Sequence, residues 1–500
     1  MNTNREEQST TGALRRIEAL REYQFTSGIP VVGGLIARLR EAWNSVATKW
    51  QGRAFIEQQS EFNRALVDWL ERPPGLTEVD ELFALHDRRR VAVNREAAVL
   101  SRRLERPHRA GSRPRVAYFS PLPPSRSGIA DYSKELLPHL ARLADITIFA
   151  EVPAAVSAAG FEVRPPAEFP SRQADFDVPL YQMGNSDQHE GLYEMLLRYP
   201  GIVVLHDFYL HHFIRHHTIG RGDWTGYGRE LGYASGSRGR NLARAIGAGE
   251  AEAPLFEVPL NDRVIDSAVG MIVHSHFVAE RVRRARPDLP LAVIPALVEL
   301  RDGRSIRPDL GLPDEVIVFG SFGQITAEKQ IDVALEAFRG LRQGFPNAHY
   351  LLAGEAQADV ELDNLLENLE LGDSVYVTGF AADLADFINR IHSVDVVVNL
   401  RQPTVGETSA IALRAMAAAR PLIVYDHGWY RELPDSAALK VPPGDVRALE
   451  QAMAVLAGSA ELRRSMGRSG FEYASDHCRP PVVAAAYHAF IESVLEPDYA

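Results

Sequence analysis

A lysine follows a glycine-rich strand end in the second half of the chain, in the string Gly-Ser-Phe-Gly-Gln-Ile-Thr-Ala-Glu-Lys that spans residues 320–329. The apolar run before this string reads as a strand, so Lys329 falls near the start of the next helix. There a mobile ammonium can face a diphosphate and stabilise the negative charge that a departing phosphate gains. A lone lysine is usually a surface residue, and the neighbouring Gly323 and Gln324 favour a binding role for this one.

A second polar loop, residues 399–409, leads into an expected helix over residues 410–419. The free N–H groups at the start of a helix attract anions. Glu407 could accept hydrogen bonds from sugar hydroxyls, or it could simply cap the helix. The other candidate binding residues of this loop are Arg401, Gly406, Thr408 and Ser409.

The first half of the chain offers two similar loops. Residues 120–133 contain Gly128 and Ile129 ahead of an expected helix, and a glycine there lets backbone approach a ligand closely. In the alternative interpretation, Asp131 or Ser133 only caps that helix. At the end of the apolar run 203–205 stand His206 and Asp207. The histidine could contact a sugar hydroxyl or the reacting oxygen, or it could be a locally satisfied structural residue.

Three other patterns are weaker. Histidines 211, 212, 216 and 217 fall in an apparently exposed helix without an ordered carboxylate, so a metal site is not expected. The Asp-Phe-Asp string at residues 175–177 matches a metal-binding pattern of sugar transferases, but it more simply opens a strand. Phe380, after Gly379, could form the wall of a base pocket, although a plain turn also fits.

Short apolar strands alternating with amphipathic helices surround these loops, which is typical of parallel sheets in doubly wound α/β domains. Two such series, joined near residues 293–300, predict two Rossmann-like halves with a cleft between them. Ligands of such sheets bind beyond the carboxyl ends of the strands. The expected strands are 116–119, 146–149, 178–182, 202–205, 271–273, 316–320, 349–352, 375–378, 394–399 and 421–425.

Residues 1–110 differ from the rest, since Arg and Glu are frequent and apolar residues recur at helical spacing over 35–50 and 55–70. We predict a helical N-terminal extension, either a small bundle or dimerisation arm, or a surface helix near lipid. The full division is 1–110 for this extension, 111–300 and 301–475 for the two Rossmann-like domains, and 476–500 for a helix that returns to the first domain.

The composition limits the function classes. Five hundred residues exceed one hydrophobic core. The net charge of −12 argues against a general nucleic-acid binder, so a phosphorylated ligand needs a local site. The single cysteine, Cys478, excludes an internal disulfide and a cysteine-based zinc site. Neither a signal-peptide pattern nor an apolar run of membrane-spanning length occurs. We expect a cytoplasmic protein, either free in the cytoplasm or peripheral on the inner face of the membrane.

Taken together, the strings Ser-Gly-Ile-Ala-Asp-Tyr-Ser, Leu-His-Asp-Phe, Val-His-Ser and Gly-Glu-Thr-Ser resemble family 4 of the retaining glycosyltransferases, over roughly residues 113–495. The resemblance implies a GT-B fold with a deep interdomain cleft and no metal or other cofactor. It implies that a nucleotide-diphosphate sugar is bound as donor mainly by the domain of residues 301–475, and a glycan or lipid-linked acceptor by the domain of residues 111–300. It implies that Lys329 and Gly128 face the diphosphate and that His206 and Glu407 contact the donor sugar.

Three positions depart from the family pattern. The family usually has an arginine where Gln324 stands, and Arg401 could replace it. The first of two family glutamates is displaced to Glu407, and Arg414 occupies the position of the second, which normally holds the ribose. The glycine expected after residues 294–295 is absent. Together these changes suggest a distinct branch of the family.

The predicted function is therefore retaining, metal-independent transfer of a sugar in polysaccharide or glycoconjugate synthesis. The alternatives are a nucleotide-sugar epimerase or sugar phosphorylase on the same fold, and a non-catalytic scaffold subunit. A nicotinamide dehydrogenase is disfavoured because the glycine fingerprint is missing.

Overall fold

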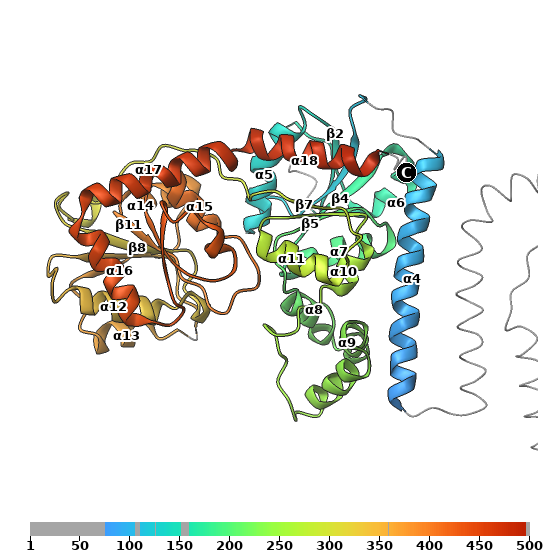
Figure 1. The fold of residues 1–500 in the computed structure, drawn as a ribbon, viewed down its shortest axis with the longest axis horizontal. Helices are drawn as coiled ribbons and strands as arrows, with labels where there is room; N and C mark the ends of the chain where they lie inside the picture. Colours follow the sequence, from blue (N-terminus) through green and yellow to red (C-terminus); the bar gives the residue numbers. More distant parts are fainter. Residues whose placement is uncertain (1–75, 106–110, 126, 152–159, 359, 497–500) are drawn as a thin grey trace, which may run out of the picture.

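Two parallel β-sheets, each built from one half of the chain, form the centre of the computed structural model (Figure 1). The structure describes residues 76–105, 111–125, 127–151, 160–358 and 360–496. Within them, one sheet has the strand order β3-β2-β1-β4-β5-β6-β7 and the other β10-β9-β8-β11-β12-β13. In each sheet the strand order reverses direction beside the strand that comes first along the chain, β1 in one sheet and β8 in the other, as in doubly wound sheets. The predicted α/β class with two Rossmann-like halves is confirmed.

The strands are short apolar runs because helices cover both faces of each sheet, which leaves no solvated face for polar side chains. In the first sheet they are β1 (Arg115–Phe119), β2 (Asp145–Phe149), β3 (Val163–Arg164), β4 (Val178–Met183), β5 (Ile202–Leu205), β6 (Gly270–Val273) and β7 (Leu291–Val293). In the second they are β8 (Val318–Phe322), β9 (His349–Ala353), β10 (Val375–Val377), β11 (Val396–Val398), β12 (Leu422–Tyr425) and β13 (Ala438–Val441).

The helices complete the two layered halves (Figure 1). Those around the first sheet are α5 (Gly128–Leu140), α6 (Phe169–Arg172), α7 (Glu190–Arg198), α8 (His211–His217), α9 (Trp224–Gly247), α10 (Asp262–Ser267) and α11 (His276–Ala285). Those around the second are α12 (Ile331–Leu341), α13 (Leu362–Asn368), α14 (Leu384–His392), α15 (Ala410–Ala417), α16 (Val446–Gly458) and α17 (Ala460–His477).

The last helix, α18 (Pro480–Leu495), continues from α17 and lies across the first sheet, against α5 (Figure 1). Its buried Tyr487 hydroxyl hydrogen-bonds the hydroxyl of Tyr132 on α5 at 2.7 Å. The chain therefore crosses between the two halves twice, once between β7 and β8 and once through α17 and α18.

Backbone contacts also join the two halves directly. The carbonyl of Val405 in the second half accepts hydrogen bonds from the amides of Phe208 and Tyr209 in the first, at 2.8 and 2.9 Å. The carboxylate of Glu432 accepts hydrogen bonds from the first two amides of α11. Gly406 lies so close to Phe208 that an added Cβ would come within 2.5 Å of the Phe208 Cβ, and its φ of 77° also requires glycine.

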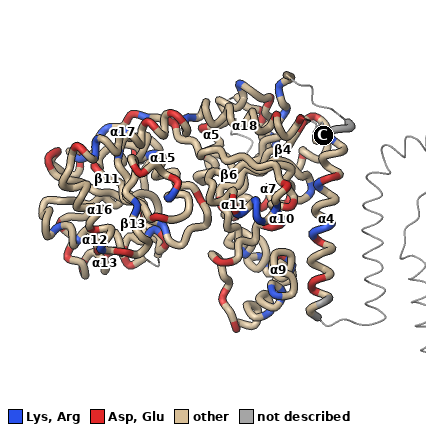
Figure 2. The backbone as a smooth tube through the Cα atoms, in the orientation of Figure 1, with Lys and Arg blue, Asp and Glu red and all other residues tan. Residues whose placement is uncertain are grey.

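The described part of the N-terminal extension is the helix α4 (Leu76–Glu105), which packs along α9 and α10. Charged residues of both signs alternate along α4, and basic residues lie on the facing α9 (Figure 2). Asp80 pairs with Arg240 and Arg244 of α9, and Glu81 accepts a hydrogen bond from the amide of Ser237 at a kink in α9. The helices expected over 35–50 and 55–70 lie outside the described residues.

Some expected bounds were wrong. The helix expected over 132–143 is α5, which begins four residues earlier, at Gly128, because Ser127 is its N-cap. The strand predicted over 394–399 is only Val396–Val398. Strands β3, β7 and β13 were not predicted, since each is four residues or fewer and without a continuous buried run. No helix among the described residues is both long and apolar enough to cross a bilayer.

Candidate functional site

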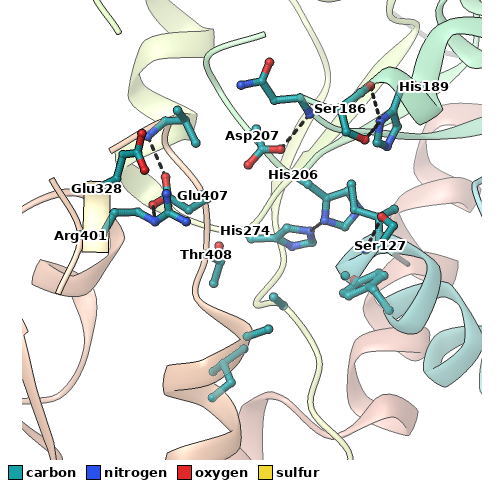
Figure 3. A pocket seen from close by; sticks show the side chains of 18 of the residues that line it. Ser127, Ser186, His189, His206, Asp207, His274, Glu328, Arg401, Glu407 and Thr408 are labelled. Atoms are coloured by element: carbon teal, nitrogen blue, oxygen red, sulfur yellow. Dashed lines mark hydrogen bonds and ion pairs between the residues drawn. The ribbon is translucent and has the colours of Figure 1, made fainter. Parts of the chain in front are cut away.

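A cleft of about 570 Å³ lies between the two sheets, where the carboxyl ends of their strands face each other. This volume falls in the usual range for small-molecule sites. Figure 3 shows Glu328, Arg401 and Glu407 on one side, with Ser127, Ser186 and His189 on the other. The predicted site residues that line the cleft are Gly128, Ile129, His206, Asp207, Arg401, Glu407 and Thr408.

Two helix N-termini reach the cleft, one from each half. Ser127 caps α5 by accepting a hydrogen bond from the amide of Ile129, so the expectation that Asp131 or Ser133 caps this helix was wrong. Ser409 caps α15 by accepting from the amide of Ala412 at 3.2 Å. Uncapped amides at such termini and the helix dipole attract negative charge, so both sides of the cleft favour an anion.

Arg401 and Glu407 form an ion pair on the second-half wall, with 2.8 Å between Nε of the arginine and Oε1 of the glutamate. The other glutamate oxygen accepts hydrogen bonds from the hydroxyl of Thr404 and the amide of Val405. Both oxygens of Glu407 are thus engaged in shaping its own loop. Among the described residues, the two terminal nitrogens of Arg401 have no bonded partner, which leaves them available to a ligand.

Lys329 lies behind this wall rather than on the cleft surface. Its ammonium donates a hydrogen bond to the carbonyl of Phe322 at 2.7 Å, and burial, with a smaller effect from Arg401, lowers the pKa of Lys329 to about 7. Gly323 has φ 79°, and a Cβ there would lie 2.6 Å from the lysine Nζ. The glycine therefore makes room for the ammonium, which explains why the two residues occur together.

Asp207 stands on the first-half wall, at the end of β5. Its Oδ2 accepts a hydrogen bond from the amide of Asn185 at 2.9 Å. Burial first, and then the nearby Glu407, raise the pKa of Asp207 to about 6. The carboxylate is consequently a base poised near neutrality, and no described residue bonds its other oxygen.

The His206 ring is engaged on both sides, as the interpretation of a locally satisfied structural histidine requires. Its Nε2 lies 2.7 Å from Oε1 of Gln182, and its Nδ1 lies 3.2 Å from Nε2 of His274 (Figure 3). His274 Nδ1 donates to the carbonyl of Ile294, which ties these side chains to the backbone after β7. Burial lowers the pKa of both imidazoles. His206 thus supports the cleft as part of this chain of side chains, and both of its ring nitrogens lie within hydrogen-bond distance of a protein partner.

A second ion pair of the cleft joins the two halves. Arg414 of α15 lies 3.3 Å from Oε1 of Glu135 on α5, and both side chains are nearly buried, at 11% and 5% exposure. The guanidinium that replaces the expected ribose-binding glutamate is therefore held by a carboxylate from the opposite half.

Six predicted site residues do not line the cleft. Phe380 is 65% exposed outside it, and Gln324 is also exposed. Lys329, Gly323, Gly406 and Ser409 lie behind the wall and shape it. The Asp175–Asp177 string opens β4 as predicted, and Asp177 accepts a hydrogen bond from the amide of Arg115 at 2.8 Å, at the start of β1.

Several lining residues were missed. Helix α8 was expected to be exposed, yet His211 is fully buried and His212 lines the cleft. Phe256 comes from an irregular segment after α9, where periodicity offers no signal. Throughout the described ranges, no group of three or more His, Cys, Asp or Glu side chains is arranged to hold a metal ion. The missed residues also include Asn185, Ser186, His189, His274 and Glu328.

Comparison with known proteins identifies relatives of part of the chain. Residues 302–473 match the family model described as Glycosyl transferases group 1. The Alpha-D-kanosaminyltransferase of Streptomyces kanamyceticus is 28% identical over 33% of this chain and 42% of its own length. The Exopolysaccharide phosphotransferase SCO2592 of Streptomyces coelicolor is 26% identical over 50% of this chain and 25% of its own length. The chain thus spans less than half the length of these curated relatives.

Among solved structures, Anabaena Alr3699/HepE in complex with UDP superimposes with a TM-score of 0.55 at 14% identity, over 76% of this chain and 100% of that one. At this identity the likeness concerns the fold, and it confirms the GT-B arrangement that the sequence resemblance implied.

Proposed function

We propose that this chain, whose residues 302–473 match the family model of the group 1 glycosyltransferases and whose fold is GT-B, transfers a sugar from a nucleotide-diphosphate donor to a hydroxyl acceptor. The observation that carries the proposal is the convergence of two helix N-termini, Arg401 and Lys329 around one cleft. In a chain of net charge −12, this is a local site for a dianionic or trianionic group. A diphosphate leaving group fits it.

The proposed reaction retains the configuration at the anomeric carbon. The acceptor hydroxyl attacks on the face from which the diphosphate departs, the anomeric C–O bond to phosphate breaks, and the departing phosphate oxygen takes the hydroxyl proton. Glu407 is unsuited to be a nucleophile because Arg401, Thr404 and Val405 occupy both of its oxygens. Orientation and charge stabilisation then carry the catalysis, without a metal ion.

Lys329 gains charge when the donor binds. Its pKa of about 7 in the free protein rises beside a diphosphate, so binding takes up a proton. The ammonium then exchanges the Phe322 carbonyl for a phosphate oxygen, the atom on which negative charge grows as the bond breaks. We further propose a role in cytoplasmic polysaccharide or glycoconjugate synthesis, which the sequence resemblance supports.

Thermal unfolding against UDP, GDP, ADP and dTDP, with and without magnesium, tests the donor site. A nucleotide at 100 times its Kd stabilises by about 2.7 kcal/mol, which raises Tm by several degrees. We expect one base to give a shift that is independent of magnesium and is lost in Lys329→Met. Lys134→Met is the matched control, because this lysine is exposed on α5.

The alternative functions predict other outcomes, in this unfolding measurement or in an incubation with the nucleotide sugar alone. No shift with any nucleotide contradicts the proposal and favours a scaffold subunit. A shift that requires magnesium contradicts metal independence. If the active donor is converted to another sugar nucleotide without an acceptor, the chain is an epimerase.

A further inference from the structure

One of the contacts that join the two halves lies beside Asp207. The next residue, Phe208, donates its amide hydrogen to the carbonyl of Val405 at 2.8 Å. Gly406 approaches the same residue so closely that an added Cβ would lie 2.5 Å from the Phe208 Cβ. The end of β5 is therefore held at a fixed spacing from the loop that carries Arg401.

The Asp207 side chain lies across the cleft from Arg401 and Glu407 (Figure 3). The pKa of Asp207 is raised to about 6, first by burial and then by Glu407, against the opposing effect of Arg401. The carboxylate is still mostly ionised at neutral pH. It also lies within electrostatic reach of the arginine that the proposed function assigns to the departing phosphate.

One oxygen of Asp207 is held and the other is free. Oδ2 accepts a hydrogen bond from the amide of Asn185 at 2.9 Å, and in the described part of the chain Oδ1 has no bonded partner. The preceding His206 differs, because both of its ring nitrogens lie within hydrogen-bond distance of Gln182 or His274. Of the two polar residues that follow β5 and line the cleft, Asp207 is therefore the one with an atom left for a ligand.

The space between Asp207 and Arg401 suits the reacting end of the donor sugar. Under the proposed function, Arg401 and the start of α15 hold the diphosphate, so the attached sugar extends from the second-half wall into the cleft. When the anomeric C–O bond breaks, its electron pair leaves with the phosphate. The anomeric carbon and the ring oxygen then become positively charged, and a carboxylate that is already in place stabilises such a charge without reorganisation.

We propose that Asp207 is a catalytic residue whose carboxylate faces the anomeric carbon and ring oxygen of the donor sugar and stabilises the positive charge that they gain in the transition state. The inference rests on the proposed transferase function. Asp207 forms no bond to the sugar and takes no proton. The acceptor oxygen forms the new bond to the anomeric carbon, and its proton goes to the departing phosphate oxygen. Arg401 and Lys329 thus stabilise the negative charge of the transition state, and Asp207 the positive charge.

The unfavourable surroundings of Asp207 in the free protein agree with this role. The carboxylate is partly buried and near the like charge of Glu407, and both effects disfavour its ionised form. An asparagine of the same shape could accept the Asn185 hydrogen bond without bringing a charge. Charges that are retained despite such surroundings are concentrated at functional sites.

Binding of charged sugar mimics to the full chain tests this role without measuring transfer. The charged probes are deoxynojirimycin and its galacto and manno isomers, in which a protonated nitrogen replaces the ring oxygen. The corresponding anhydrohexitols are neutral and have nearly the same shape. Each probe is titrated calorimetrically with the preferred nucleoside diphosphate at saturation. We expect at least one iminosugar to bind about tenfold more tightly than its neutral counterpart.

The variant Asp207→Asn removes the charge and keeps the shape of the side chain. It should reduce the preference for the iminosugar to within about twofold and lower kcat about 30-fold, with little change in KM for the donor. Binding of the neutral probe and the nucleotide shift in Tm should not change, which also shows that the variant folds. Asp187→Asn, at an exposed carboxylate a few residues after β4, is the matched control. Mass spectrometry of the wild type with donor alone should show no sugar adduct.

Three results would overturn the inference: no iminosugar preferred by the wild type, a preference that survives in Asp207→Asn or a kcat of this variant within about threefold of wild type, or a sugar bound covalently to Asp207. An intact nucleotide shift in these cases leaves the donor site supported. If no nucleotide shifts the Tm of the wild type, the proposed function is contradicted, and the role of Asp207 is contradicted with it.

Discussion

The two walls of the cleft differ in the kind of polar group that they present. The second-half wall is charged, with Arg401, Glu407 and, behind them, the Lys329 ammonium. The first-half wall is mostly neutral, with imidazoles and an aromatic ring beside the carboxylate of Asp207. Under the proposed function, the cleft must hold an anion that departs and a hydroxyl that attacks, and each wall has the chemistry of one of these tasks.

The contrast also shows how each wall is kept in place. Charge on the second wall is balanced within one loop, because Glu407 pairs with Arg401 and with the backbone of its own segment. The first wall is fixed by hydrogen bonds between separate elements, with Asn185 joining β5 and α8. Substitutions on the second wall should therefore act on the departing phosphate, and those on the first on the sugar and the hydroxyl that attacks it.

The largest expected effect is at Arg401. Among the residues described, Arg401 is the only cation of the second-wall loop whose terminal nitrogens are available to the cleft. Arg401→Met removes this cation, and turnover should fall about 100-fold. Since this also leaves Glu407 unpaired, the double variant Arg401→Met/Glu407→Gln separates folding from catalysis: it should regain stability without regaining turnover. Turnover of the single variant within tenfold of wild type would contradict the assignment.

The next effect is on the pH dependence of nucleotide affinity. Lys329 binds an anion only when protonated, and its free-state pKa is about 7, so affinity should be highest below pH 7 and fall about fivefold between pH 7 and 8. Calorimetric titration at several pH values measures this. Lys329→Met should show only the slope that comes from the phosphate itself. Equal slopes for the two proteins would exclude Lys329 as the titrating group.

A smaller effect is expected at the interdomain ion pair. Glu135→Gln leaves Arg414 nearly buried without a carboxylate, which should weaken the joined arrangement of the halves and reduce nucleotide affinity about threefold to tenfold. The double variant Glu135→Gln/Arg414→Met should recover most of the loss, because the unpaired charge is gone. If the two substitutions act additively, the pair does not couple the walls.

The smallest effect concerns stability. The pKa of Asp207 is raised to about 6 from the usual value near 4, so the folded protein holds this proton more tightly than the unfolded chain. The ionised carboxylate therefore destabilises the fold, and its contribution to stability falls as pH rises from about 4 to 6. Asp207→Asn should raise Tm by about 2 °C at pH 7.5 and change it little at pH 4. Differential scanning calorimetry at both pH values checks this.

The sequence was most informative where a general physical rule determines which residue types must occur in a segment. Buried parallel strands need continuous apolar runs, so β1, β4 and β5 were found to within about two residues. The spacing of Gly323 and Lys329 pointed to a lysine at a strand end, and the structure adds the reason, since only glycine leaves space for the ammonium.

Features that depend on tertiary contacts could not be read from the sequence. His212 was placed on an exposed helix because its neighbours are polar, but α8 is short and its N-terminal turn faces the cleft. Phe256 has no periodic neighbours at all. The engagement of His206 depends on Gln182 and His274, which lie 24 and 68 residues away along the chain.

The hydrogen bonds to the carbonyl of Val405 offer a direct way to measure whether the two halves are in contact. Because this one oxygen receives the amides of both Phe208 and Tyr209, any separation of the halves releases two neighbouring protons to solvent at once. Hydrogen–deuterium exchange at these two amides would then proceed in step and at the rate of cleft opening, independently of the strands beside them. Ligands that bridge the walls would slow this exchange, so occupancy of the cleft could be followed without measuring transfer.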